Sequence, residues 1–145
     1  MTAKDRYDSL FQYYGEQNHV DWRLLKAQAT LESGLDPDIA GPTGDLGLSQ
    51  FIESTWKMVT GRWHKRSGAL IDRRDPEDAI QAQAEFMGGL LHQFKDDHRL
   101  ALAAYNCGPG RVQRGLDHGF TYESMTIPAS TRAYVERVTR ILATS

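Results

Sequence analysis

The sequence predicts an all-α domain of about six or seven helices with little or no sheet. Apolar residues recur at the three- and four-residue spacing of a helix along most of the chain. Residues that typically begin and end helices stand at the borders of these segments. The 145 residues are 40% hydrophobic and 25% charged, near the average of globular proteins. A chain of this length can bury one core, so we expect residues 1–145 to form a single domain.

Six segments carry the helical spacing. They cover residues 7–14, 22–31, 49–60, 79–94, 100–106 and 134–142. Only Gln83 interrupts the apolar stripe of the fourth segment. Capping residues agree with these borders, because Asp21 can cap the second helix and Pro128 can open the last. Asp75 followed by Pro76 provides an N-cap and a first-turn proline for the fourth helix.

Glycines end three of the expected helices. Gly34, Gly61 and Gly108 follow the second, third and fifth segments, where a left-handed residue would close the helix. Two stretches, 33–47 and 107–119, concentrate turn-forming residues and are expected to be loops. No repeat or low-complexity run divides the chain, which supports one domain.

Composition and charge exclude several classes of function. Seventeen Lys and Arg against nineteen Asp and Glu give a net charge of −2, so we expect no nucleic-acid partner. The single cysteine, Cys107, cannot form an intramolecular disulfide and offers no zinc cluster. No run approaches the roughly 18 apolar residues of a membrane span, and no signal peptide is recognisable. We expect no metal, no cofactor and no stable membrane insertion.

Glu32 is the candidate catalytic residue. It stands at the end of the apolar segment 22–31 and is followed at once by Ser33 and the helix-ending Gly34. The negative end of the helix dipole and apolar neighbours would both favour the protonated carboxyl, which is the state that a general acid needs. The alternative is a solvated glutamate in a fraying last turn.

Three short motifs follow the pair Glu32-Ser33. They are Gly47-Leu48-Ser49-Gln50-Phe51, Ala104-Tyr105-Asn106-Cys107-Gly108 and Ser130-Thr131-Arg132-Ala133-Tyr134-Val135. With this order and spacing the chain resembles the soluble lytic transglycosylase family, which is related to goose-type lysozymes. The family pattern is E-S, then G-L-M-Q, then A-Y-N-x-G, then E-T-x-x-Y-V. The resemblance covers residues 24–142 and implies a helical, lysozyme-like domain with a glycan-binding groove.

The resemblance also implies an activity and a set of site residues. It implies cleavage of the β-1,4 bond between N-acetylmuramic acid and N-acetylglucosamine in peptidoglycan, with formation of 1,6-anhydromuramic ends. Glu32 would act first as general acid and then as base. The implied substrate-binding residues are Ser33, Gln50, Phe51, Tyr105, Asn106 and Tyr134. A single carboxylate suffices for this route, because the substrate's own acetamido group assists, whereas the usual glycosidases need two.

Two positions depart from the family pattern. Ser49 replaces the methionine of G-L-M-Q, which predicts the loss of a flexible apolar wall of the sugar site. Ser130 replaces the glutamate of the last motif, which predicts the loss of a buried acid. Neither change removes Glu32 itself. We therefore expect activity to survive, with altered positioning of the sugar.

Two alternative functions stay open. A muramidase would use Glu32 with a water activated by one of the carboxylates that follow it, Asp36, Asp38, Asp45 and Glu53. A non-cutting module would keep the groove and bind the cell wall without cleaving it. The usual role of each of the four later carboxylates is that of a turn or helix-end residue.

The expected partner is the glycan strand of peptidoglycan, bound by a monomer. We expect action on the cell wall, in the periplasm or outside the cell. Without a signal peptide, the chain fits a phage lysis or virion-borne enzyme, or an excised bacterial domain. A basic connector, 62–74, carries Arg62, Trp63, His64, Lys65, Arg66, Arg73 and Arg74. This connector could bind an anionic glycan or form a solvated loop.

Overall fold

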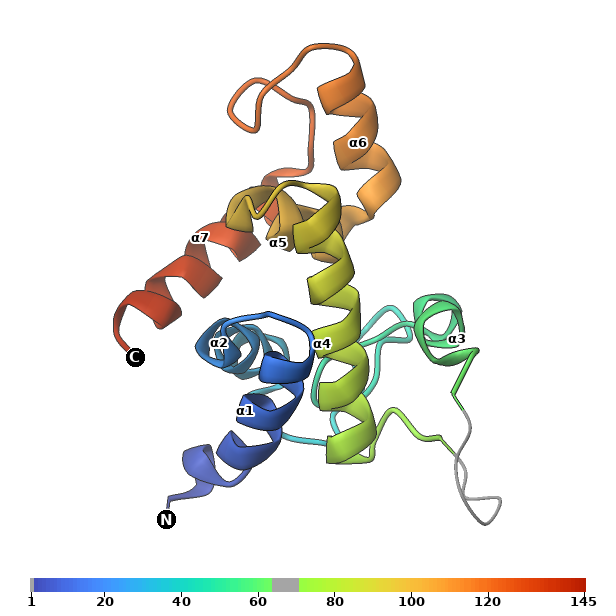
Figure 1. Ribbon diagram of the computed structural model, residues 1–145, viewed down its shortest axis with the longest axis vertical. Helices are drawn as coiled ribbons and strands as arrows, with labels where there is room; N and C mark the ends of the chain where they lie inside the picture. The colour runs from blue at the N-terminus through green and yellow to red at the C-terminus, as the bar shows by residue number, and fades with distance from the viewer. Residues whose placement is uncertain (1, 64–70) are drawn as a thin grey trace. The chain divides into compact units, whose positions relative to one another are not determined.

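Seven α-helices and one short 3₁₀ helix form the regular structure of residues 2–63 and 71–145, the part of the chain that the computed structural model describes (Figure 1). In chain order they are η1 (Ala3–Asp5), α1 (Asp8–Gln17), α2 (Trp22–Ser33), α3 (Glu53–Thr60), α4 (Pro76–Gln93), α5 (His98–Cys107), α6 (Pro109–Asp117) and α7 (Ala129–Ala143). Within these ranges the only β pairings are two isolated bridges, Ala40 with Leu46 and Leu46 with Phe51. The predicted all-α class is confirmed.

The chain divides into two compact units, Met1–Glu85 and Phe86–Ser145. The border falls within α4, so the first unit holds η1 to α3 with the start of α4, and the second holds the rest of α4 with α5 to α7. In the described ranges, none of the helices is long and apolar enough to cross a membrane.

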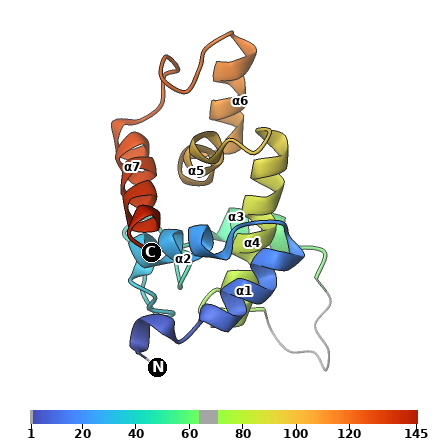
Figure 2. The same cartoon turned by 60° about the vertical axis from the view of Figure 1, so that its left-hand side comes forward.

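In the first unit α1 packs against α2, and the two helices lie side by side in both views (Figures 1 and 2). Phe11 of α1 and Leu24 and Leu25 of α2 are buried. A Cβ atom at Gly15 would stand 2.8 Å from the carbonyl oxygen of Val20, so glycine permits this close approach.

A hydrogen bond ties α1 to the first turns of α4. The hydroxyl of Tyr14 donates to Glu77 Oε2 at 2.6 Å. Burial of the phenol, with this bond to a carboxylate, raises the pKa of Tyr14 well above its ordinary value. The tyrosine is therefore a neutral hydrogen-bond donor at neutral pH.

The capping residues expected from the sequence occupy their positions. The Asp21 carboxylate accepts the backbone N–H two residues on at 3.0 Å, and that of Asp75 accepts the N–H three residues on at 2.9 Å. Gly34 ends α2 in the left-handed region, with φ 65°. Gly61 corrects the expectation, because its φ of −59° is right-handed and α3 ends without a left-handed residue.

The third helix begins later than predicted. The sequence predicts helix from residue 49, but α3 starts at Glu53. Gln50 adopts a left-handed φ of 53°, which an α-helix does not allow, and Phe51 pairs with Leu46 in a bridge. Residues 49–52 therefore belong to the loop that follows α2.

The expected loop 107–119 is mostly helix. Its residues Pro109–Asp117 form α6, which packs against α5 in the second unit. Proline fits the first helical position, because its missing N–H would have no partner there. Two glycines of this stretch have a positive φ: Gly108, between α5 and α6, with φ 98°, and Gly119, after α6.

Helix α5 lies at the centre of the core of the second unit. α5 contributes five consecutive buried residues and packs against both α6 and α7. Val112 of α6 and Val138 of α7 are fully buried. The turn between α4 and α5 contains two left-handed residues, Lys95 and Asp96, after which Asp97 caps α5 by accepting the Leu100 N–H at 3.1 Å.

Side-chain hydrogen bonds hold the loop 46–51 of the first unit. The Arg73 guanidinium donates to the carbonyl oxygens of Phe51 at 2.9 Å and Gly44 at 3.1 Å. Gly47 has a φ of 86°, and a Cβ atom there would lie 2.0 Å from the Arg73 carbonyl oxygen. The glycine of the G-L-S-Q motif is thus required by its backbone conformation and by this contact.

Replacing Gly47 by alanine should destabilise the chain more than replacing Gly44. Both residues have a positive φ, but a Cβ atom at Gly44 meets nothing within 4 Å. We expect Gly44→Ala to lower the free energy of unfolding by about 1 kcal/mol from backbone strain, and Gly47→Ala by about 3 kcal/mol or more. Urea denaturation followed by circular dichroism measures both, and equal losses would contradict the steric role of Gly47.

Candidate active site

Glu32 lies in the last turn of α2, where the sequence predicts it. The side chain is half-buried, and the helix ends two residues later at Gly34. Gln28, one turn earlier on the same face, is fully buried. The acid candidate therefore stands at the exposed end of a helix face whose earlier turns belong to the core.

Ser33 joins the end of α2 to the loop 46–51. Its hydroxyl is 6% exposed and lies 2.7 Å from the carbonyl oxygen of Leu48 and 3.1 Å from that of Ala29. A hydroxyl has one hydrogen to donate, and both acceptors belong to the protein. In this conformation Ser33 positions the loop beside Glu32, and its hydroxyl faces the protein interior.

Gln50 uses its amide nitrogen to hold its own loop. The two N–H bonds of Nε2 point to the carbonyl oxygens of Gly47 at 2.8 Å and Ile39 at 3.0 Å. The side-chain oxygen accepts no hydrogen bond from residues 2–63 or 71–145. This oxygen is therefore the atom that Gln50 can offer to a sugar hydroxyl or amide.

The ring of Phe51 belongs to the core of the first unit. It is 3% exposed and makes an edge contact with Trp56, with 5.5 Å between the ring centroids. The carbonyl oxygen of Phe51 accepts the Leu46 N–H at 3.1 Å and the bond from Arg73. Phe51 thus shapes the loop by packing and by backbone pairing, and its buried ring offers no face for stacking on a sugar.

Ser49 points into the core, which corrects the expectation of a lost sugar-site wall. Its side chain is 1% exposed, and the hydroxyl lies 2.9 Å from Gln83 Oε1 and 3.2 Å from the Ala79 carbonyl oxygen. A serine at this position pairs with the one polar residue in the apolar stripe of α4. The sequence showed Ser49 and Gln83 as two separate irregularities, whereas the fold joins them.

The carboxylates that follow Glu32 mostly have local partners. Asp36 accepts the Asp38 backbone N–H at 2.9 Å. Asp45 accepts the N–H and the hydroxyl of the threonine two residues before it, at 3.2 and 2.9 Å. Glu53 lies 3.4 Å from the ammonium of the lysine one turn later in α3. Among the described residues no three His, Cys, Asp or Glu side chains are grouped to hold a metal ion.

In the second unit, Asn106 is oriented by Thr131. The Thr131 hydroxyl, on α7, donates to Asn106 Oδ1 at 2.7 Å; Thr131 is 1% exposed, whereas Asn106 is exposed. With its oxygen engaged, Asn106 presents its NH₂ group as a donor. Sequence reasoning omitted Thr131 from the site, although it is the threonine of the E-T-x-x-Y-V pattern.

Two tyrosines of the motifs lie in the same unit. The Tyr105 ring, at the end of α5, packs on Phe86 with 5.3 Å between centroids. Tyr134 is buried and follows Thr131 by one turn of α7, so the two share a helix face. Ser130 is exposed in the first turn of α7. An acid at position 130 would therefore stand at the surface, which corrects the expectation of a lost buried acid.

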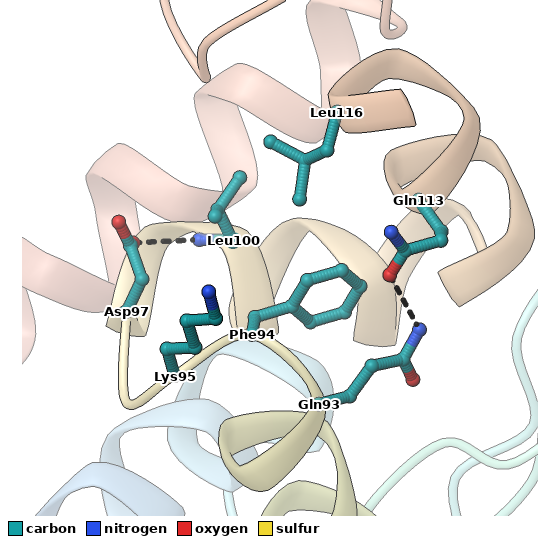
Figure 3. A pocket seen from close by; sticks show the side chains of 7 residues that line it. All are labelled: Gln93, Phe94, Lys95, Asp97, Leu100, Gln113 and Leu116. Atoms are coloured by element: carbon teal, nitrogen blue, oxygen red, sulfur yellow. Dashed lines mark hydrogen bonds between the residues drawn. The ribbon is translucent and has the colours of Figure 1, made fainter. Parts of the chain in front are cut away.

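The second unit has a pocket of about 490 Å³. None of the motif residues lines it. In Figure 3, Leu116 points from α6 toward the ring of Phe94. A hydrogen bond of 3.2 Å between Gln93 and Gln113 borders the pocket. The remaining lining residues are Lys95, Asp97 and Leu100.

Three described residues of the basic connector have partners within the protein. Arg73 binds loop carbonyl oxygens, Arg74 lies 3.5 Å from Asp72, and the Trp63 indole donates to Glu85 at 3.0 Å. Arg73, Arg74 and Trp63 thus have protein partners, which neither the glycan-binding nor the solvated-loop interpretation of the connector predicts. His64, Lys65 and Arg66 lie outside the described residues.

Comparison with known proteins assigns the family. The model of the transglycosylase SLT domain matches residues 9–125. The chain belongs to the transglycosylase SLT domain family. Peptidoglycan transglycosylase gp16 of Escherichia phage T7 is 40% identical over 106 residues, which are 73% of this chain and 8% of that protein. Membrane-bound lytic murein transglycosylase F of Pasteurella multocida is 34% identical over 117 residues, 77% of this chain and 22% of the relative.

Solved structures of SLT-domain proteins share the fold. The 70 kDa soluble lytic transglycosylase of Escherichia coli matches 96% of this chain and 24% of its own, with a TM-score of 0.81 and 28% identity. The lytic transglycosylase Slt of Pseudomonas aeruginosa, at 21% identity and a TM-score of 0.79, covers 95% of this chain and 23% of its own, and supports the fold alone. The chain thus spans a small part of each relative.

Replacing Thr131 by valine should release Asn106. Valine has nearly the same shape but no hydroxyl, so the Asn106 oxygen loses its donor. We expect the free energy of unfolding to fall by about 1–2 kcal/mol. Thr139→Val on the same helix, which removes only a bond to the Val135 carbonyl, should stay within about 0.5 kcal/mol. Equal losses of unfolding free energy in the two variants would show that the Thr131–Asn106 hydrogen bond does not contribute to stability.

Proposed function

We propose that this chain is a peptidoglycan lytic transglycosylase that cleaves the β-1,4 bond between N-acetylmuramic acid and N-acetylglucosamine. The proposal is supported by membership in the SLT domain family and by the relatives named peptidoglycan and murein transglycosylases. It is supported further by a glutamate in the last turn of α2 whose next residue is bonded to the motif loop.

In the proposed reaction one carboxyl group acts twice. Glu32 first gives its proton to the glycosidic oxygen, and the bond from that oxygen to C1 of the muramic acid breaks. The substrate's acetamido oxygen stabilises the positive charge at C1. The Glu32 carboxylate then takes the proton of the C6 hydroxyl, and O6 bonds to C1. The products are a free 4-hydroxyl and a 1,6-anhydromuramic end, and no water is consumed.

The observation that favours this route over hydrolysis is that carboxylates following Glu32 already have hydrogen-bond or ion-pair partners within the protein. Asp36, Asp45 and Glu53 each hold a turn or an ion pair in the first unit. A hydrolytic base must instead hold and deprotonate a water. The substrate-assisted route needs only Glu32, and the amides of Gln50 and Asn106 would supply an acceptor and a donor for the sugars.

The proposed partner is the glycan strand, and the proposed place of action is the cell wall, in the periplasm or outside the cell. We propose that the chain acts as a monomer. The similarity to a protein of phage T7 and to a bacterial enzyme supports a wall-cutting role in either setting.

Replacing Glu32 by glutamine tests the proposal. Glutamine keeps the shape of the side chain but can neither protonate the leaving oxygen nor accept the C6 proton. We expect at least about a 100-fold loss in the release of soluble fragments from purified sacculi. Mass spectrometry of the wild-type products should find fragments one water lighter than hydrolytic products and resistant to borohydride.

Glu53→Gln is the matched control, because Glu53 is also a glutamate of the first unit, paired with a lysine on α3. It should release fragments at the wild-type rate. Borohydride-reducible ends would replace the proposal with a muramidase, and then Asp45 and Glu53 would be tested as its base. Binding to sacculi without release by the wild type would indicate a non-cutting wall-binding module.

A further inference from the structure

A fully buried glutamine lies on the apolar face of α4. Gln83 has 0% exposure, and its side-chain amide has three hydrogen-bond partners in the first unit. Its oxygen accepts from the Ser49 hydroxyl at 2.9 Å. Its nitrogen donates to the Leu25 carbonyl oxygen at 2.9 Å and to Gln28 Oε1 at 3.1 Å. The amide therefore uses both of its N–H bonds and its oxygen.

The Leu25 carbonyl sets the orientation of this amide. Rotating the Gln83 amide by 180° would bring its oxygen against the Leu25 oxygen, and a carbonyl cannot donate a hydrogen bond. Only the observed orientation satisfies the backbone partner, and it leaves the Gln83 oxygen facing Ser49. Because burial makes an unsatisfied polar group costly, losing any one of these bonds leaves a buried group without that partner.

The partners of Gln83 belong to the two segments that carry candidate site residues. Leu25, Gln28 and Glu32 are spaced by three and four residues, so they share one face of α2. Ser49 lies between Leu48, whose carbonyl is bonded to Ser33, and Gln50. One side chain of α4 thus holds the helix of the acid and, through Ser49, the loop of the sugar-binding amide.

We propose that Gln83 is a positioning residue that, together with Ser49, holds the Gln50 loop at a set distance from Glu32. This inference rests on the proposed function, and it identifies two residues that position the candidate active site. An apolar residue of the same volume would fill the space in α4 equally well but would not determine where the loop sits, which is the role attested for some buried polar groups. Small displacements of groups that orient substrate reduce turnover strongly.

The test separates stability from activity with two variants. Ser49→Ala removes the donor and leaves the Gln83 oxygen buried without its partner, so it should lower both stability and turnover. Adding Gln83→Leu removes that orphaned oxygen but also takes the donor from Gln28 Oε1 and from the Leu25 carbonyl oxygen, so S49A/Q83L is compared with wild type at a temperature at which both are fully folded. Its kcat/KM on defined glycan chains should nevertheless stay roughly tenfold or more below wild type, mainly through kcat.

Gln81→Leu is the matched control on the same helix. The Gln81 amide donates to Glu85 within α4, at 3.0 Å. Its kcat/KM should equal that of wild type. Recovery of kcat/KM in S49A/Q83L, or an unchanged kcat/KM in both Ser49 variants, would overturn the positioning role.

Hydrogen exchange tests the tether without relying on activity. The Gln50 N–H bonds to Gly47, and the Gly47 N–H bonds to Ile39, inside the loop. In S49A/Q83L both amides should exchange at least about tenfold faster than in wild type, whereas Q81L should leave them unchanged. Unchanged exchange in the double variant would overturn the inference, whether or not the wild type cuts glycan. A wild type that cuts no glycan would overturn only the proposed function.

Discussion

The loop that follows the acid-bearing helix is held by hydrogen bonds to its own backbone carbonyls. Ser33 donates to Leu48, Gln50 donates to Gly47, and Arg73 donates to Phe51. A loop that lacks helix or sheet ladders must satisfy its buried carbonyls in some other way, because an unpaired one is costly. Here the donors are side chains from α2, from the loop itself and from the segment before α4, so the loop conformation depends on residues far apart in the chain.

Each of the two candidate substrate-binding amides has one end bonded to the protein, and the bonded end differs between them. Gln50 has its nitrogen bonded to loop carbonyls, which leaves the oxygen as acceptor. Asn106 has its oxygen bonded to Thr131, which leaves the NH₂ as donor. An amide whose one end is bonded cannot rotate freely, so each unit presents a defined hydrogen-bonding group. Such preorganisation lowers the entropy lost when a substrate is ordered.

Most of the fold could be predicted from local signals. The caps at Asp21 and Asp75 and the left-handed Gly34 are short-range chemistry, and each is present. The errors arose where one signal had two interpretations. The glycine- and proline-rich stretch 107–119 predicts a loop, but proline also begins helices, as Pro109 does in α6.

The sequence by itself determined the helical class, the helix-ending acid candidate and the family motifs, because these depend on residue identity and spacing along a few turns. The tertiary structure decided what the motif side chains do. Ser49 and Gln83 are 34 residues apart, and Gln83 and Leu25 are 58 residues apart. Periodicity indicates which face of a helix is buried, but a hydrogen bond between such distant residues is set only when the elements pack. For this reason Ser49, a departure from the family pattern in the sequence, is a buried partner of Gln83 in the fold.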